Sequence, residues 1–411
     1  MKLKLVVASM SALALISCPA FAADGDAAAP QHKHHTRTVH HKVVVHNLKG
    51  EEAMPASSSL ASGWFNKISL GGGVNADTKI GRLYNGRQYI GENNSRMSLN
   101  NAYLNLNADV NEYAKAFVGL TYQDPSVSYG TNTTTRFTVE QVYGTLSNAS
   151  QTPFYLKVGK QFTNFGMYDA HALIQPITTA LSESLQDAVT VGFDTSMNSS
   201  VNFFGSVYGF SDNSVQNGST GATKNGMNGG ARLGIGQTND QLGWDLSADY
   251  MNNFTGVNNV QTQLAANNNS TVTGYSYNSK VGAGAINADI NSGGFKLALR
   301  YVQALTTFNS ADLLSTNGTS GAKPYAANIT AAYGFNGMNV DQDVSLAYDM
   351  SHDAVSLSVP RDRWTVGYDV SVLKNATIGA EFNHDRDYST NNRGTGTTSN
   401  QFGVRVGVKF G

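Results

Sequence analysis

The sequence predicts an all-β protein: a closed transmembrane antiparallel β-barrel, of sixteen strands by our count, formed by residues 67–411. Three observations predict it. Short segments with an apolar residue at every second position recur throughout this stretch, and period two is that of a strand with one apolar face. The breaks between them are alternately short and long. Only 14% of residues are charged, while 42 are Gly, 19 Tyr and 18 Phe.

Five segments show the alternation most clearly, and they are 244–250, 295–301, 328–335, 364–372 and 402–410. In the last of them, Phe402, Val404 and Val406 alternate with Gly403 and Arg405. A soluble sandwich could show this pattern once or twice. Its repetition over one undivided stretch favours a barrel whose apolar face contacts lipid.

The breaks predict the orientation of the barrel. Short turns rich in Asn, Asp, Gly and Ser are expected at 111–112, 147–153, 194–200, 237–242, 291–294, 336–339 and 373–375. Longer polar loops are expected at 77–97, 123–136, 163–187, 211–228, 252–280, 305–324, 351–362 and 385–399. Bacterial outer-membrane barrels have their short turns in the periplasm and their long loops outside. An even number of strands places both chain ends at the periplasmic rim.

The hydropathy of the chain is compatible with this membrane location. Mean hydropathy is −0.27, and beyond the N-terminus no apolar run approaches the ~20 residues of a spanning helix. A spanning strand needs only ~9–11 residues, of which half face lipid. Trp64, Trp244 and Trp364 fall at predicted strand ends, where aromatic girdles lie.

The N-terminus predicts export through a signal peptide at residues 1–22. Lys2 and Lys4 precede an apolar stretch at 5–16, and the small-residue site Ala-Phe-Ala follows at 20–22. An alternative is a lipoprotein box that keeps Cys18, the single cysteine, as a lipidated first residue. Pro19 and the downstream site favour ordinary cleavage before Ala23. No disulfide is then expected.

Residues 23–66 form a separate region, a His-rich periplasmic extension. Six of the nine histidines lie here, namely His32, His34, His35, His40, His41 and His46. Clustered imidazoles could bind Zn, Cu or Ni. The competing interpretation, which we favour, is a disordered linker with weak pH-dependent charge. We therefore expect no cofactor, with weak metal binding by this cluster as the alternative.

The inward faces of the predicted strands carry charges of both signs. Five basic residues are candidates for the pore lining: Lys115, Lys157, Lys296, Arg300 and Arg405. A water-filled lumen can solvate such charges, or they can form a transverse field that orients dipolar solutes. In 139–146 and 201–210 both faces carry apolar residues, so the sequence does not assign their facing.

One long loop, 163–187, differs from the others. It mixes apolar residues with Asp169, His171, Gln175 and Glu183 and has less Gly and Asn than the other loops. By analogy with sixteen-stranded porins, the loop after the fifth strand folds inward and narrows the pore. The alternative is a loop that caps the barrel from outside.

Catalytic function is not predicted. Ser351, His352 and Asp353 are adjacent in a polar loop, and His384 precedes Asp385, but adjacency in sequence does not bring side chains into hydrogen-bond geometry. A net charge of −1 gives no indication of a nucleic-acid partner. The ~45 residues between the signal peptide and the barrel are too few for a globular plug domain.

A family resemblance adds to these predictions. The segments 141–146 (QVYGTL), 153–162 (PFYLKVGKQF) and 164–168 (NFGMY) resemble the core of the LbtU-type siderophore porins, with further similarity at 181–184 and 189–193. The resemblance implies an outer-membrane barrel that takes up ferric siderophores without a plug. The helical periplasmic segment of that family is not evident, and the His-rich extension takes its place. Outer-membrane barrels also usually end on an aromatic residue, whereas Gly411 follows Phe410 here.

We therefore expect a porin-like channel of the bacterial outer membrane for small polar solutes, of which a ferric siderophore is favoured by the resemblance. The alternatives are a general or anion-preferring diffusion porin and a structural or adhesive barrel. Expected partners are outer-membrane lipid, the solute and the barrel-assembly machinery. Monomers and homotrimers are both compatible with the sequence, because apolar strand faces can contact lipid or a neighbouring subunit.

Overall fold

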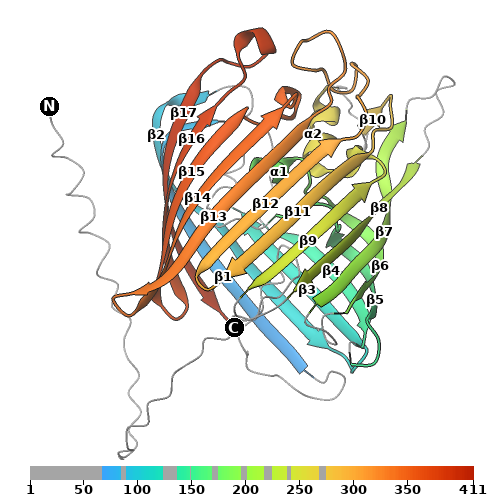
Figure 1. Cartoon of the computed structure of the whole chain (residues 1–411), viewed down its shortest axis with the longest axis vertical. Helices are drawn as coiled ribbons and strands as arrows, with labels where there is room; N and C mark the ends of the chain where they lie inside the picture. Colours follow the sequence, from blue (N-terminus) through green and yellow to red (C-terminus); the bar gives the residue numbers. More distant parts are fainter. Residues whose placement is uncertain are drawn as a thin grey trace, which may run out of the picture. The chain divides into compact units, whose positions relative to one another are not determined.

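The computed structural model describes residues 67–84, 89–123, 137–148, 150–168, 175–195, 201–216, 225–237, 242–267 and 275–411. Within these ranges, sixteen antiparallel strands form one closed ring (Figure 1). Each strand pairs with the next along the chain, and the last strand, β17, pairs with β1. One further short strand, β10 (Tyr275–Tyr277), is not part of the ring and pairs in parallel with the last residues of β7. The predicted fold class is confirmed.

The strands of the ring follow one another at regular intervals. They are β1 (Lys67–Tyr84), β2 (Tyr89–Asp109), β3 (Ala114–Gln123), β4 (Phe137–Ser147), β5 (Phe154–Phe162), β6 (Leu185–Asp194), β7 (Val201–Gln216), β8 (Asn225–Gln237), β9 (Gly243–Met251), β11 (Ala283–Ser292), β12 (Phe295–Ala304), β13 (Tyr325–Gly337), β14 (Val340–His352), β15 (Asp362–Leu373), β16 (Ala376–Arg386) and β17 (Thr398–Phe410).

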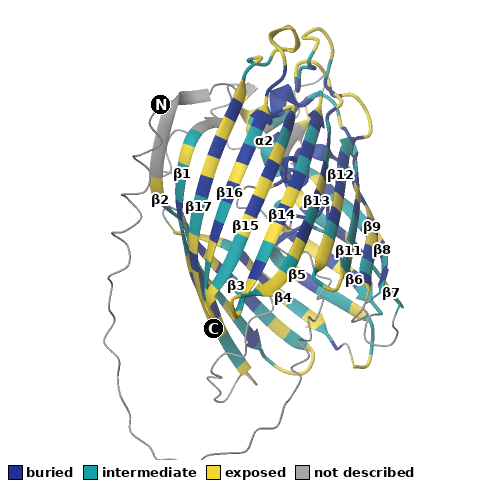
Figure 2. Cartoon of the chain, turned by 60° about the vertical axis from the view of Figure 1, so that its left-hand side comes forward, coloured by how far each residue is buried: buried dark blue, intermediate teal, exposed yellow. Residues whose placement is uncertain are grey.

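Burial alternates along the strands with the predicted period of two. In β15, Trp364 and Val366 are about half exposed, while Thr365 between them is 3% exposed. Figure 2 shows the same alternation of exposed and buried positions along β15, β16 and β17. The exposed apolar face suits lipid, and the buried face lines the lumen.

The structure also assigns the facing of the two segments that the sequence left open. In β4, Tyr143 is buried and faces the lumen, whereas Val142 is exposed. In β7, Tyr208 and Phe210 face the lumen and Val207 faces outward. Where β3 pairs with β4, the register shifts between Gly119 and Leu120 of β3. The residues of β4 before this shift, such as Val139, therefore face the opposite way from what the alternation of Gln141 and Tyr143 would give. Both faces of β4 and β7 are apolar in the sequence because aromatic residues face the lumen while other apolar residues face outward.

Two of the predicted long loops are shorter than expected. The expected loop 77–97 consists mostly of strand, because β1 continues to Tyr84 and β2 begins at Tyr89. In the same way β7 continues to Gln216, within the expected loop 211–228. A hairpin that extends beyond the apolar belt can be polar on both faces. The alternation on which the sequence prediction rested is then lost.

Short helices lie in the connections rather than in the wall. They are α1 (Ile177–Ala180), η2 (Phe254–Gly256), α2 (Asn258–Asn267), η3 (Val355–Leu357) and η4 (Thr390–Asn392). Across the described ranges, no helix is both long and apolar enough to cross a membrane. The predicted signal peptide and the His-rich extension, residues 1–66, lie outside the described residues.

Candidate functional site

The connection between β5 and β6 folds into the lumen. We call residues 163–184 the inward segment; the structure describes 163–168 and 175–184. Its helix α1 packs against β12, β13 and β14, well around the ring from the strands that the segment joins (Figure 1). Phe165 and Leu181 are fully buried. The inward fold expected for this loop is therefore present over its described residues.

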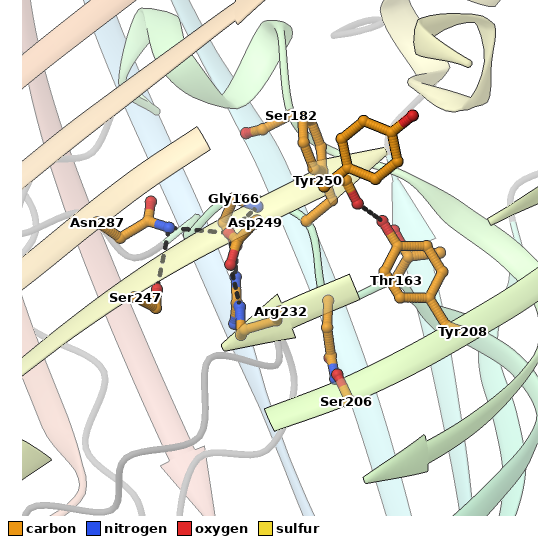
Figure 3. Close-up of polar contacts among 12 residues, drawn as sticks. Thr163, Gly166, Ser182, Ser206, Tyr208, Arg232, Ser247, Asp249, Tyr250 and Asn287 are labelled. Atoms are coloured by element: carbon orange, nitrogen blue, oxygen red, sulfur yellow. Dashed lines mark hydrogen bonds and ion pairs between the residues drawn. The ribbon is translucent and has the colours of Figure 1, made fainter. Parts of the chain in front are cut away.

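The start of the inward segment is held by a buried ion pair, shown in Figure 3. Asp249 on β9 accepts hydrogen bonds from Arg232 on β8, at 2.7 Å to Nε and 2.8 Å to Nη2. The same carboxylate accepts the backbone N–H of Gly166 at 2.8 Å and the amide of Asn287 at 2.9 Å. Arg232 also donates to the Gly166 carbonyl at 2.6 Å. We call Arg232, Asp249 and Asn287 the entry anchor.

Gly166 is required at this point for a steric reason. Its φ is +76°, and an added Cβ would lie 2.4 Å from Cβ of Ser182 on the returning part of the segment. A side chain would push these two parts of the segment apart. The Tyr168 hydroxyl donates to the Phe165 carbonyl at 2.8 Å and closes the same tight turn.

The far end of the inward segment is held by the opposite wall. The Asp349 carboxylate on β14 accepts the backbone N–H of Ile177 at 2.9 Å and the amide of Asn328 at 2.9 Å. Arg363 on β15 donates to the Gln175 carbonyl at 3.3 Å and pairs with Asp385 at 2.6 Å. We call Asp349 and Arg363 the far-wall anchor. The described parts of the inward segment are therefore held at two places, by the entry anchor at Gly166 and by the far-wall anchor at Gln175 and Ile177.

Other connections pack onto the inward segment and form an apolar core inside the ring. The backbone N–H of Asn258 donates to the Glu183 carbonyl at 2.9 Å, and Ser184 donates to the Gly256 carbonyl at 2.7 Å. These bonds join the connection 252–282 to the inward segment. The core draws on several connections, whose buried members include Phe165, Leu181, Phe254, Leu264, Phe308, Leu313 and Leu357. A mixed polar and apolar loop sequence therefore encodes packing within the lumen.

The lumen wall on the other side is polar and carries both signs of charge. Arg405 on β17 pairs with Asp77 on β1 at 2.7 and 2.9 Å, and Lys79 lies 3.8 Å from the same carboxylate. Lys157 on β5 lies over the ring of Tyr143, 3.8 Å from its centroid. Such a wall can interact favourably with solutes of positive or negative charge.

The predicted pore-lining residues fall into three groups. Asp169 and His171 lie outside the described residues. Gln175 and Glu183 belong to the inward segment, and both have backbone carbonyls that accept structural hydrogen bonds. The basic candidates lie on the wall, where Lys157, Arg300 and Arg405 are buried or half-buried and Lys115 and Lys296 are exposed near turns.

The two residues of the far-wall anchor are not among the site residues predicted from the sequence. Asp349 and Arg363 have the same parity as the buried lumen-facing residues of their strands, so the alternation contained the signal. Arg363 was missed because the expected loop ended at residue 362, immediately before it. Asp349 binds a backbone group, the N–H of Ile177, and a hydrogen bond to a loop backbone leaves no pattern in the sequence.

Ser351 and Asp353, two candidate catalytic residues in the sequence, make structural contacts. The Ser351 hydroxyl lies 2.6 Å from the Tyr388 hydroxyl and 2.7 Å from the Pro360 carbonyl. The Asp353 carboxylate accepts the backbone N–H groups of Thr316 and Lys323. No cluster of three metal-binding side chains occurs among the described residues. The histidines at 32–46 fall outside that part of the chain.

Sequence comparison finds distant relatives of this chain. No family model matches it. A UPF0422 protein of Coxiella burnetii is 23% identical over 318 residues, covering 77% of this chain and 65% of the relative. A UPF0422 protein of Legionella pneumophila is 23% identical over 339 residues, covering 76% and 62%. The chain thus spans slightly less than two thirds of the length of these curated relatives.

Structure comparison finds porins. The anion-selective porin from Comamonas acidovorans superimposes with a TM-score of 0.54 at 12% identity, covering 84% of this chain and 99% of that one. Salmonella typhi OmpF, in a complex with daunomycin, gives 0.52 at 13% identity with 84% and 98% coverage. The outer-membrane channel DcaP of Acinetobacter baumannii gives 0.52 at 13% identity with 84% and 97% coverage. The chain therefore has the fold of the outer-membrane porins.

Proposed function

We propose that this protein is an outer-membrane channel that admits small polar solutes past the inward segment. The observation that carries the proposal is the inward segment itself, anchored at Asp249 on one side and at Asp349 on the other. A segment held inside a lumen reduces its cross-section. The polar wall beside it supplies hydrogen-bonding groups for a solute that leaves bulk water.

Reconstitution into planar bilayers tests this proposal. The purified barrel should give stepwise ion currents, and vesicles that contain it should swell in isotonic solutions of small sugars or amino acids. A protein that inserts as a folded barrel but gives no current and no swelling would refute the channel. The structural or adhesive alternative would then be favoured.

The charge of the wall bears on the alternative of a general or anion-preferring diffusion porin. Cations and carboxylates are paired along it, as in Arg405 with Asp77 and Arg300 with Asp289. Paired charges produce little net field at a distance. We therefore expect weak ion selectivity. The reversal potential in a salt gradient measures this directly, and a strong preference for either sign would contradict a balanced wall.

We further propose a ferric siderophore as the favoured solute. The support is the resemblance of residues 141–168 to the siderophore porins, a stretch that forms β4, β5 and the start of the inward segment. Uptake of radioactive ferric siderophore by iron-starved cells should fall when the gene is deleted. Expression should also be repressed by iron. Unchanged uptake would reject the siderophore while leaving the channel in place.

A further inference from the structure

Two arginines lie together on the outer surface of the barrel, at the end of the wall where the long connections lie. Arg386 ends β16, and Arg361 immediately precedes β15. Asp362, the first residue of β15, is the register partner of Arg386. Both Asp362 and Arg386 have the parity of the exposed residues Trp364 and Phe382. Asp362 and Arg386 therefore face the membrane and not the lumen. Arg361 has the parity of Arg363, but it lies just outside the strand, and its side chain reaches the outward Asp362 carboxylate, with Nε 3.7 Å from Oδ2.

The carboxylate holds both guanidinium groups from beneath. Arg386 donates to Asp362 Oδ2 through Nε at 2.9 Å, and its Nη2 lies 2.8 Å from the same oxygen in an ion pair. Arg361 Nε lies 3.7 Å from the same oxygen. The side chain of Asp362 is 7% exposed, whereas those of Arg361 and Arg386 are 54% and 50% exposed. Two positive charges share one negative charge, so the exposed group keeps a net charge of +1.

The depth of this group in the membrane follows from its neighbours. Trp364 is two residues further along β15 and packs against Tyr348 on β14, with ring centroids 4.6 Å apart. A two-residue step along a strand is about 7 Å. Aromatic girdles lie at the boundary between lipid chains and headgroups. The arginines, one step beyond the girdle, are at the level of the headgroups.

We propose that Arg361 and Arg386 bind the phosphate group of a lipid headgroup in the leaflet that faces the long connections. This proposal rests on the outer-membrane orientation proposed above. Guanidinium groups match phosphate oxygens with paired hydrogen bonds. Asp362 already orders the Arg386 side chain through hydrogen bonds, which lowers the entropy that binding must overcome. The exposed Trp364 beneath them offers an apolar surface to the lipid chains and favours a lipid over free phosphate.

The arginine beside them on the chain serves as an internal comparison. Arg363 has the opposite parity, faces the lumen and pairs with Asp385 at 2.6 Å, with a side-chain exposure of only 12%. Its role in the far-wall anchor is therefore separate from lipid binding. Substitution of the two outward arginines should leave the inward segment in place.

Binding of the purified barrel to lipid A, added in detergent micelles, tests the proposal. The double variant Arg361→Ala/Arg386→Ala should bind lipid A about tenfold more weakly or worse, because each basic residue near an anionic surface contributes ~1 kcal/mol. The matched control is Lys280→Ala/Lys323→Ala, which removes two exposed cations from the connections. It should change binding by less than about twofold, since these lysines are not part of the group formed by Arg361, Asp362 and Arg386.

Three further results decide the outcome. Dephosphorylated lipid A should bind the natural protein as weakly as the double variant binds lipid A, and inorganic phosphate should not compete at concentrations similar to those of the lipid. Arg361→Lys/Arg386→Lys, which keeps both positive charges, should recover only part of the affinity that the alanine variant loses. Equal lipid A binding by the natural protein and by Arg361→Ala/Arg386→Ala would overturn the proposal. So would an equal loss of lipid A affinity in the control Lys280→Ala/Lys323→Ala. Bilayer currents from the same preparations report separately on the proposed channel.

Discussion

Replacement of Asp249 by alanine should release the inward segment. Asp249 accepts four hydrogen bonds, two from Arg232, one from the backbone N–H of Gly166 and one from Asn287. Arg232 is only 9% exposed. Without its partner, this guanidinium stays buried as an unpaired charge unless the surrounding structure moves.

The expected magnitude follows from that geometry. Breaking a buried ion pair by removing one partner costs about 3–5 kcal/mol. Each 1.4 kcal/mol corresponds to a tenfold change in an equilibrium constant. If the cost falls on the anchored state alone, the ratio of anchored to released segment decreases by about two to three and a half powers of ten. Movement of the segment also lets water reach Arg232, so local release relieves most of the cost.

Single-channel recording in planar bilayers is the appropriate assay. Asp249→Ala should give a larger conductance, or rapid fluctuation between the natural and a larger level. The matched control is Asp289→Ala, because Asp289 pairs with Arg300 at 2.7 Å on the same wall. Among the described residues, the other hydrogen bonds that Arg300 donates go to the backbone carbonyls of Ala288 and Leu299 on that wall. The control should lose stability, measured as the urea midpoint, and keep the natural conductance.

Two results would contradict this reasoning. The first is a conductance of Asp249→Ala that equals that of Asp289→Ala. The second is a larger conductance in both variants, which would mean that any loss of a lumen ion pair widens the pore. In either case the entry anchor would not be what positions the segment.

Three other predictions address the remaining contacts. Asp349→Ala should also raise the conductance, and combined with Asp249→Ala its effect should be less than additive, because both changes release one segment; a double-mutant cycle of conductances measures this. Gly166→Ala should lower the melting temperature in detergent, since φ there is +76° and strain of this kind costs about 1–3 kcal/mol; the control Gly144→Ala, where an added Cβ meets no atom closer than 3.9 Å, should melt as the natural protein does. Burial raises the pKa of Tyr388, in the connection after β16, to about 12. The folded state therefore keeps this proton where the unfolded chain loses it, and stability should fall as pH rises from about 10 to 12; urea unfolding should show a smaller fall in Tyr388→Phe, and an equal fall in both proteins would rule this origin out.

The barrel wall could be predicted from the sequence because its determinants are local. Each strand has to present apolar residues to lipid at every second position, as Trp364 and Val366 do, and this requirement repeats in every strand. The prediction failed where the requirement ends. In residues 77–97 the strands extend beyond the apolar belt, and the alternation no longer distinguishes a strand from a loop.

The interior could be predicted only in part. The composition of 163–187 indicated a packed loop, but the contacts of Asp249 and Asp349 are with backbone groups far away in the sequence. No local pattern reports such pairing. The apolar core likewise depends on how the connections between β9 and β15 meet, as where Asn259 donates to the Leu357 carbonyl at 2.9 Å. Each connection alone reads as a polar loop with scattered apolar residues.

The closure of the ring has a consequence for how this protein folds. The seam between β1 and β17 joins residues at nearly opposite ends of the chain, and Arg405 and Asp77, which pair across it, are 328 positions apart. Contacts between such distant residues form slowly, because the intervening chain must be ordered first. Until then β1 and β17 are open edges that can pair with another chain. We therefore expect the seam between β1 and β17 to close late in folding, and once it has closed the ring has no open strand edge to pair with another chain.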